Sequence, residues 1–228
     1  MLSSVIMHPI ATIQTDLTAK FGVPRQSGLA DLPARIVFKP HYRNADALRG
    51  LEQYSHLWIL WVFSETERSK WSPTVRPPRL GGNKRLGVFA TRSPFRPNPI
   101  ALSSVRLVRI ETHTPNGPIL HILGADMMNG TPVLDIKPYL PYTDAHPDAC
   151  GGFAEAVKDK CLSVVFAESC RGVLSPEKEE ILRQLLAQDP RPAYQDNPDR
   201  EYRFSYGGYC VRFTVCKRIL NVTGIENL

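Results

Sequence analysis

The chain has 228 residues, of which 43% are hydrophobic, and a formal net charge of +6 at neutral pH. This length allows a substantial core in one or two domains, and the composition excludes a disordered chain. The longest strongly apolar run, Leu57–Phe63, is too short to cross a bilayer, and no signal peptide is predicted. Five cysteines without C-x-x-C spacing predict neither a disulfide framework nor a metal site, so we expect a soluble cytoplasmic protein with no membrane association.

Short strands separated by turns are predicted through the first two thirds of the chain. Their ranges are Val5–Thr15, Leu32–Lys39, His56–Phe63, Leu86–Ala90, Ile100–Arg109, Pro118–Leu123, Thr131–Ile136 and Cys161–Phe166. Asn44 is expected to cap a short helix over Ala45–Leu51. Many short strands with few helices predict a mainly β fold in which residues 1–168 form an antiparallel β-barrel. The missing G-x-G-x-x-G motif argues against a Rossmann domain.

The remaining residues, 169–228, predict a small C-terminal α+β domain. Ser175 is expected to cap a helix that has Pro176 at its first position and an apolar face of leucines and isoleucine. Two alternating stretches, Tyr202–Tyr206 and Tyr209–Lys217, are joined by a pair of glycines and predict a β-hairpin.

The stretch Gly87–Leu102 is the most distinctive part of the chain. Its two arginines, Arg92 and Arg96, alternate with three prolines, which exclude a helix or a central strand and predict a stiff, irregular loop. A loop that is already ordered loses little entropy on binding, so its guanidinium groups suit an anionic or polar ligand. A rigid structural connector with solvated arginines is the alternative.

Positive charge is concentrated in residues 68–109, here called the basic segment. It contains ten Lys or Arg residues and no Asp or Glu, so it carries +10 and leaves −4 for the rest of the chain. Aromatic and apolar residues are interleaved through it, which indicates a folded surface rather than a tail. Such a surface suits a polyanion, and solvated surface charge is the alternative.

Several of these stretches together resemble the TsaA/TrmO family of S-adenosylmethionine-dependent tRNA methyltransferases. The resemblance rests on GVFATRSPFRPNPIALSSVRL, on PTVRPPRLGGNKRLG before it, on NGTPVLDIKPYLPY after it, and on FGVPRQ, LEQYSHLWILWVF and LAQDPRPAY elsewhere. It implies a homodimeric β-barrel enzyme that methylates N6 of N6-threonylcarbamoyladenosine at position 37 of tRNA. It also implies cofactor contacts from these residues: Pro24, Arg25, Gln26, Ser64, Glu65, Arg92, Leu102, Asn129, Gly130, Thr131 and Pro132.

Two positions depart from the family pattern. Members often have Asp where this chain has Asn129, and His-Gln or His-Lys where it has Ser64 and Glu65. These departures support a second hypothesis, a non-catalytic RNA-binding barrel. A small-molecule methyltransferase on the same scaffold is a third hypothesis, and the basic segment argues against it because a small substrate needs no such electrostatic field.

Methyl transfer from a sulfonium to N6 is mainly a positioning task and requires no metal. The carbamoyl group withdraws the N6 lone pair and acidifies its N–H, so a nearby base would help, and Asp135 and Tyr139 are the candidates. The alternatives are an ion pair between Asp135 and Lys137 or an arginine, and a packing role for Tyr139. The threonyl carboxylate of the substrate could be bound by Lys137, Arg92 or Arg96.

The rest of the basic segment is expected to contact the tRNA anticodon arm. Phosphate contacts are predicted for Arg76, Arg79, Lys84 and Arg85. Trp71 or Phe95 could stack on a base of the loop, with ordinary packing as the alternative. The rigid C-terminal segment Asp189–Tyr194, which carries Arg191, is expected to contact either the cofactor domain or the tRNA.

Overall fold

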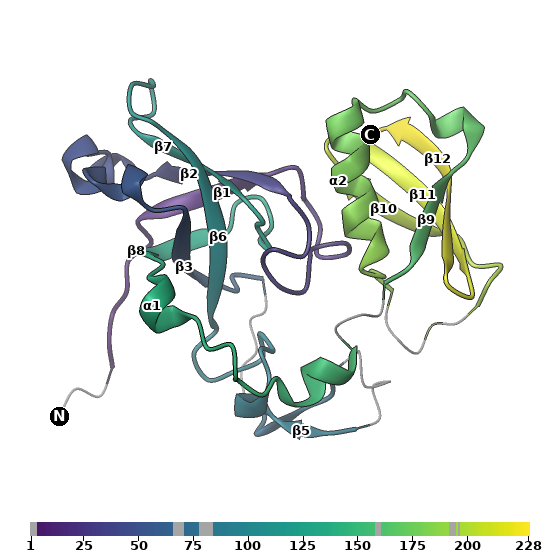
Figure 1. Ribbon diagram of the computed structural model, residues 1–228, viewed down its shortest axis with the longest axis horizontal. Helices are drawn as coiled ribbons and strands as arrows, with labels where there is room; N and C mark the ends of the chain where they lie inside the picture. Colours follow the sequence, from purple (N-terminus) through teal and green to yellow (C-terminus); the bar gives the residue numbers. More distant parts are fainter. Residues whose placement is uncertain (1–3, 66–70, 78–83, 158–160, 192–194, 196) are drawn as a thin grey trace.

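The fold was analysed in a computed structural model that describes residues 4–65, 71–77, 84–157, 161–191, 195 and 197–228. A β-barrel and a four-stranded sheet with a helix form two separate bodies, and a small two-stranded sheet lies beyond one end of the barrel (Figure 1). None of the helices in the described parts of the chain combines the length and the apolar character needed to span a bilayer.

The barrel is closed, with six antiparallel strands in the order β1-β2-β7-β6-β3-β8. The strands are β1 (Ala11–Thr15), β2 (Pro33–Phe38), β3 (His56–Val62), β6 (Ile100–Glu111), β7 (Ile119–Leu123) and β8 (Pro132–Pro138). Side chains alternate between the two faces of a strand, and in β3 this alternation buries Leu57, Ile59 and Trp61. The predicted mainly β, non-Rossmann fold is confirmed, although the first strand begins later than Val5.

The predicted short helix over Ala45–Leu51 is confirmed only in part. The structure has two 3-10 turns there, η2 (Ala45–Leu48) and η3 (Leu51–Gln53). Gly50 separates them with a φ of 87°, a left-handed conformation that interrupts helical geometry. Asn44 does cap the first turn as predicted, because its side chain accepts a hydrogen bond from the Asp46 amide at 2.9 Å.

Within the basic segment, the predicted strand Leu86–Ala90 is shorter than expected. Only β5 (Leu86–Gly87) is extended, and it pairs antiparallel with β4 (Thr74–Val75). The chain then turns into the 3-10 helix η5 (Val88–Ala90), whose first amide donates to the Pro73 carbonyl at 2.9 Å. The other short helices among the described residues are η1 (Pro40–Tyr42), α1 (Pro141–Asp144), η6 (Gly152–Val157) and η7 (Glu168–Cys170).

The C-terminal sheet has the order β10-β11-β12-β9. Its strands are β9 (Ser163–Phe166), β10 (Tyr202–Tyr206), β11 (Tyr209–Cys216) and β12 (Ile219–Asn227), with the helix α2 (Pro176–Ala187) beside them. The predicted helix and hairpin are therefore present, whereas β12 was not predicted. β9 was expected in the barrel domain but pairs in parallel with β12. We therefore propose a domain boundary before β9 instead of at residue 168.

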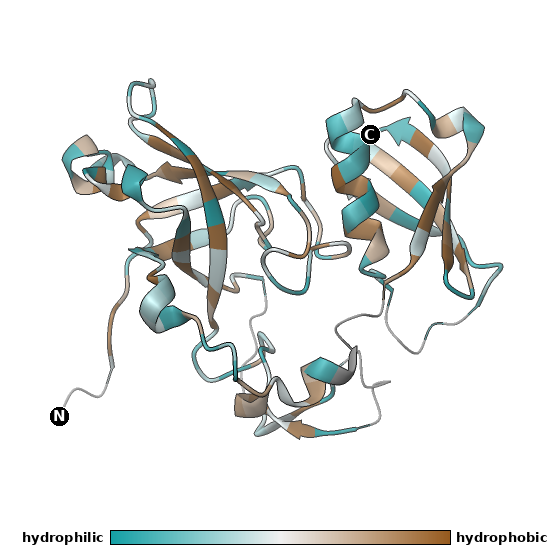
Figure 2. Cartoon of the chain, in the orientation of Figure 1, coloured by the Kyte–Doolittle hydropathy of each residue, from teal (hydrophilic) through white to brown (hydrophobic). Residues whose placement is uncertain are grey.

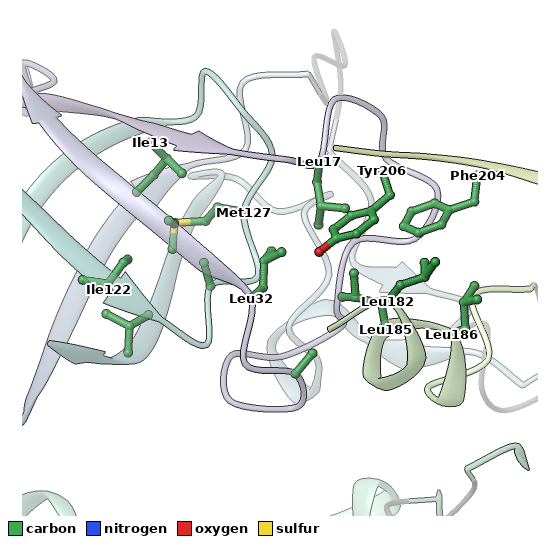
Figure 3. Close-up of a cluster of buried hydrophobic side chains, with 14 of the residues drawn as sticks. Ile13, Leu17, Leu32, Ile122, Met127, Leu182, Leu185, Leu186, Phe204 and Tyr206 are labelled. Carbon is green, nitrogen blue, oxygen red and sulfur yellow. The ribbon is translucent and has the colours of Figure 1, made fainter. Parts of the chain in front are cut away.

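The barrel and the C-terminal sheet share one buried hydrophobic cluster. Leu17 and Leu32, from the loops of the barrel, lie beside Tyr206 and Leu182 of the C-terminal body (Figure 3). Hydrophobic positions alternate with polar ones along the strands, as the banding in Figure 2 shows. A hydrogen bond from the Gly207 amide to the Asp16 carbonyl, 3.0 Å, adds a polar link between the two bodies. This junction fixes the long loop between β1 and β2, where the site residues gather.

Candidate functional site

The loop between β1 and β2 connects site residues that are far apart in the sequence. Its central part, Lys20–Ser27, is here called the hub loop. The Arg92 guanidinium donates from Nη1 to Oε1 of Gln26. At the other end of the hub loop, Lys20 donates from Nζ to the Glu65 carbonyl at 2.5 Å and lies 3.6 Å from its carboxylate. The hub loop thus joins the segment after β3 to the Pro-rich loop, and so brings together several residues for which the family resemblance predicts cofactor contacts.

The hub loop also binds the segment after α2. Arg25 donates from Nη2 to the carbonyls of Asp189, at 2.8 Å, and Arg191, at 3.2 Å. The Arg191 side chain is only 7% exposed, and its Nε lies 2.9 Å from Oδ1 of Asp189. The hydrogen bond to Asp189 raises the pKa of Arg191 above its ordinary value, against an opposing effect of burial. The segment Asp189–Tyr194 was expected to contact either the cofactor domain or the tRNA, and its first residues contact the hub loop of the barrel. The Arg191 guanidinium faces Asp189. Residues 192–194 lie outside the described part of the chain.

A carboxylate that the sequence analysis missed lies next to this arrangement. Ser103 donates from Oγ to Oδ1 of Asp126 at 2.6 Å, and Trp61 donates from Nε1 to Ser103 Oγ at 2.8 Å. Desolvation by burial raises the pKa of Asp126 to about 6, although the Ser103 bond, the positive charge of Arg92 and a backbone hydrogen bond from Ser27 all act in the opposite direction. Asp126 is therefore mainly ionised at neutral pH. Its carboxylate interacts with both the Ser27 backbone of the hub loop and the charge of Arg92. The sequence signal was a single acidic residue in the otherwise apolar run Leu123–Met128.

The raised pKa of Asp126 predicts a pH dependence of stability. The folded state binds this proton more tightly than the unfolded chain, so the contribution is present at low pH and is lost as the pH rises through about 6. We expect the free energy of unfolding of the wild-type protein, minus that of Asp126→Asn at the same pH, to fall by about 2 kcal/mol between about pH 4 and pH 7. Urea unfolding across this range measures the difference. Asp148→Asn, at an exposed position, is the control, and parallel curves for wild type and Asp126→Asn would contradict the prediction.

The predicted turn after β7 lies three residues beyond Asp126. Asn129 accepts a hydrogen bond at Oδ1 from the Thr15 amide, 3.3 Å, and its own amide donates to the Leu17 carbonyl at 2.8 Å. Gly130 has a φ of 85°, which only glycine adopts readily, and Thr131 is buried. Asparagine is therefore compatible with this turn, because its side chain and amide both have partners at the end of β1.

Some of the predicted site residues lie on the outer face of the barrel, away from the hub loop. Leu102 is 50% exposed and points outward, since the neighbouring Ser103 points into the barrel. On the same outer face, Leu60 lies opposite both Leu102 and Asp135. Asp135 forms an ion pair with Lys137 at 3.0 Å, which is the pairing considered as the alternative to a catalytic base.

Of the remaining predicted residues, Tyr139 packs with its ring 5.5 Å from that of Trp58. Pro24 is buried, Ser64 is exposed at the end of β3, and Pro132 opens β8. In the described part of the basic segment, the exposed cations are Arg76, Lys84, Arg85, Arg92, Arg106 and Arg109, while Arg79 lies outside the described residues. In the parts of the chain that the structure describes, no group of three or more His, Cys, Asp or Glu side chains could hold a metal ion.

The residues around the hub loop suit a ligand that carries both signs of charge. Arg92 is exposed, and its bond to Gln26 occupies one of the five N–H donors of a guanidinium. Asp126 supplies a partly buried carboxylate beside it. A zwitterionic cofactor with a carboxylate and a cationic centre, such as S-adenosylmethionine, fits this donor set.

Comparison with known proteins places the chain among S-adenosylmethionine-dependent tRNA methyltransferases. Residues 12–145 match the family model for the tRNA-methyltransferase O N-terminal domain, and residues 159–228 match the model for the TrmO C-terminal domain. The tRNA (adenine(37)-N6)-methyltransferase of Escherichia coli K12 is 43% identical over 234 residues, and the alignment covers 99% of this chain and 99% of that protein. A relative from Pseudomonas aeruginosa, 44% identical over 205 residues and 86% of each chain, carries the name of an S-adenosylmethionine-dependent methyltransferase. The crystal structure of TrmO from P. aeruginosa aligns with a TM-score of 0.81 at 34% identity, over 100% of this chain and 99% of that one.

Proposed function

The chain belongs to the TrmO family, and we propose that it transfers a methyl group from S-adenosylmethionine to N6 of the adenine at position 37 of tRNA. The observation that carries this proposal is the full-length similarity to an enzyme named for this reaction, in both domains of the chain. The specific substrate that we propose is N6-threonylcarbamoyladenosine, because its carboxylate suits the cationic site.

When bound, S-adenosylmethionine supplies a methyl group on a positively charged sulfur. We assign to Arg92 the binding of an anionic group of the cofactor or the substrate, and to Gln26 the orientation of the Arg92 guanidinium. Asp126 acts as a positioning residue, since its carboxylate attracts Arg92 and its bond to Ser103 ties it to β6. The hub loop and the Asn129–Pro132 turn complete the walls of the site.

A substrate that lacks the threonylcarbamoyl group should be rejected. Without it, a cation in the site loses its carboxylate partner, and an unpaired charged group in a binding site is costly. Arg92 and Arg96 are candidates for this cation. Lys137 and Asp135 form an ion pair. This pair would have to open before Lys137 could bind the substrate carboxylate or Asp135 could act as a base. Asp135 and Tyr139 stay as predictions for the base.

The basic segment predicts tRNA binding that is sensitive to salt. Four phosphate contacts give a slope of about −3 in a plot of log affinity against log salt, or about a fiftyfold loss between 50 and 200 mM. Replacing Lys84 or Arg85, both exposed, with alanine should reduce the slope by about 0.7 each. Fluorescence anisotropy with labelled tRNA measures this. Arg49→Ala, at an exposed position outside the segment, should leave the slope unchanged, and a flat salt response of the wild type would contradict tRNA docking on this surface.

We further propose that the protein acts as a homodimer in the cytoplasm. Exposed apolar side chains at Ile100 and Leu102 on β6 support an interface on the outer barrel face, because such patches mark contact surfaces. Light scattering on the purified protein tests the dimer.

Incubation with methyl-labelled S-adenosylmethionine tests the proposed reaction. The label should enter tRNA that carries N6-threonylcarbamoyladenosine and should not enter tRNA purified from cells unable to make this modification. Cofactor binding without transfer to either tRNA would instead support a non-catalytic RNA-binding barrel.

A further inference from the structure

Two exposed aromatic side chains lie together in the basic segment, away from the barrel core. Phe89 is 73% exposed and Trp71 is 52% exposed. Their ring centroids lie 6.2 Å apart with an angle of 32° between the ring planes. The guanidinium carbon of Arg96 lies 6.0 Å from the centre of the Phe89 ring. We call Trp71, Phe89 and Arg96 the aromatic shelf.

The fold holds the shelf in place. Pairing of β4 with β5 brings Trp71, three residues before β4, next to Phe89, two residues after β5. Between them, Val88 is 1% exposed and its amide donates to the Pro73 carbonyl at 2.9 Å. Arg96 is fixed by a hydrogen bond from its Nη1 to the Thr91 carbonyl at 2.8 Å. Exposed rings on an ordered backbone are unusual without a partner, because leaving them in water forgoes the gain from burial.

We propose that the aromatic shelf is a stacking platform for an unpaired base that neighbours the target adenosine in the anticodon loop. The inference rests on the proposed function and adds to it a surface that selects an open, single-stranded loop. RNA-binding proteins read such loops by stacking splayed bases on aromatic rings and guanidinium planes, and the shelf offers both kinds of surface.

Charge and distance favour an RNA base over another occupant. The exposed cations Arg76, Lys84 and Arg85 belong to the same β4–β5 region, so the shelf lies within a positive field that suits a phosphate backbone. Phe89 is three residues before Arg92, so their Cα atoms lie at most about 11 Å apart. A strand whose target nucleotide reaches Arg92 can therefore place the adjacent base on the Phe89 ring.

Binding of an anticodon stem-loop that carries the modified adenosine tests the platform. Phe89→Ala should weaken binding by about ten- to a hundredfold, whereas Phe89→Tyr, which keeps the ring, should bind within about twofold of the wild type. Tyr54→Ala is the matched control, because it removes an exposed ring that precedes β3, whereas Trp71 and Phe89 of the shelf belong to the β4–β5 region. Affinity for S-adenosylmethionine should be the same in all four proteins.

An abasic version of the stem-loop separates stacking from charge. With the bases at positions 36 and 38 removed, Phe89→Ala and the wild type should bind with equal affinity. An undiminished effect of Phe89→Ala on the abasic RNA would overturn the proposal, as would wild-type affinity of Phe89→Ala for the complete stem-loop. A change from dimer to monomer in Phe89→Ala would also overturn the proposal, because it would show that the aromatic shelf forms an interface between two copies of the protein. Wild-type methyl transfer, measured in parallel, distinguishes failure of this inference from failure of the proposed function.

Discussion

Replacing Arg92 with alanine is expected to lower kcat/KM for methyl transfer to tRNA by about a hundredfold. Arg92 is the exposed guanidinium that the hub loop fixes through Gln26 and that lies in the field of Asp126. Removing a charged group that is already oriented toward a ligand costs about this much in transition-state stabilisation. Arg92→Lys should recover only part of the loss, because an ammonium group cannot form the two parallel bonds of a guanidinium. Steady-state kinetics with methyl-labelled cofactor measures both variants.

The matched control for Arg92 is Arg203→Ala. Arg203 is an exposed guanidinium on β10, with its Nε 3.8 Å from a Glu201 carboxylate oxygen, and it belongs to the C-terminal sheet. Its loss changes the net charge by the same amount and should alter kcat/KM by less than about threefold. If Arg92→Ala were as active as Arg203→Ala, the Pro-rich loop would be the structural connector that its sequence also allows.

Gly22→Ala is expected to destabilise the protein by about 3 kcal/mol, which corresponds to a fall in melting temperature of about 10 °C. Gly22 has a φ of +94°, and a Cβ added there would lie 1.9 Å from Cε2 of Phe204. Phe204 is 2% exposed in the core that joins the two bodies, so its ring has no free space to move into. The backbone strain of alanine at this φ and the overpacking against Phe204 therefore both lower the free energy of unfolding. Thermal and urea unfolding measure the loss.

Two further variants separate the causes of that loss. Gly28 is also in the left-handed region, with a φ of +75°, but a Cβ there would meet nothing within 4 Å. Gly28→Ala should therefore show the backbone cost alone, about 1 kcal/mol. In a Phe204→Ala background, Gly22→Ala should cost about as much as Gly28→Ala. Equal costs of Gly22→Ala in both backgrounds would show that the hub loop does not pack on the C-terminal sheet.

The sequence was informative where the signal is local. Alternation in His56–Val62 and the cap at Ser175 depend on neighbouring residues, so β3 and α2 could be predicted within a residue or two. β12 was missed because Gly224 interrupts its pattern, although Leu220 and Val222 alternate. The assignment of β9 failed for a different reason, since no local feature tells a strand which sheet it will join.

The site could be predicted in part through the family resemblance. That resemblance named Gln26 and Arg92, but their hydrogen bond joins residues 66 positions apart, and Arg25 reaches a carbonyl 164 positions away. Such contacts are set by the closure of the barrel and by the docking of the C-terminal sheet, which sequence periodicity does not contain. Asp126 lay outside every motif, and only its burial next to Ser103 identifies it.

A crystal structure of the protein soaked with S-adenosylmethionine would show where the cofactor binds. We expect the cofactor to contact Arg92 and Gln26 and to lie beside the Asp126 carboxylate. A groove of about 590 Å³ elsewhere on the barrel is lined in part by Arg35, Arg109 and His121, and reaches Asn129 at one edge. Cofactor bound against Arg109 and His121 in that groove, with Arg92 left in contact with Gln26 alone, would contradict this placement of the cofactor.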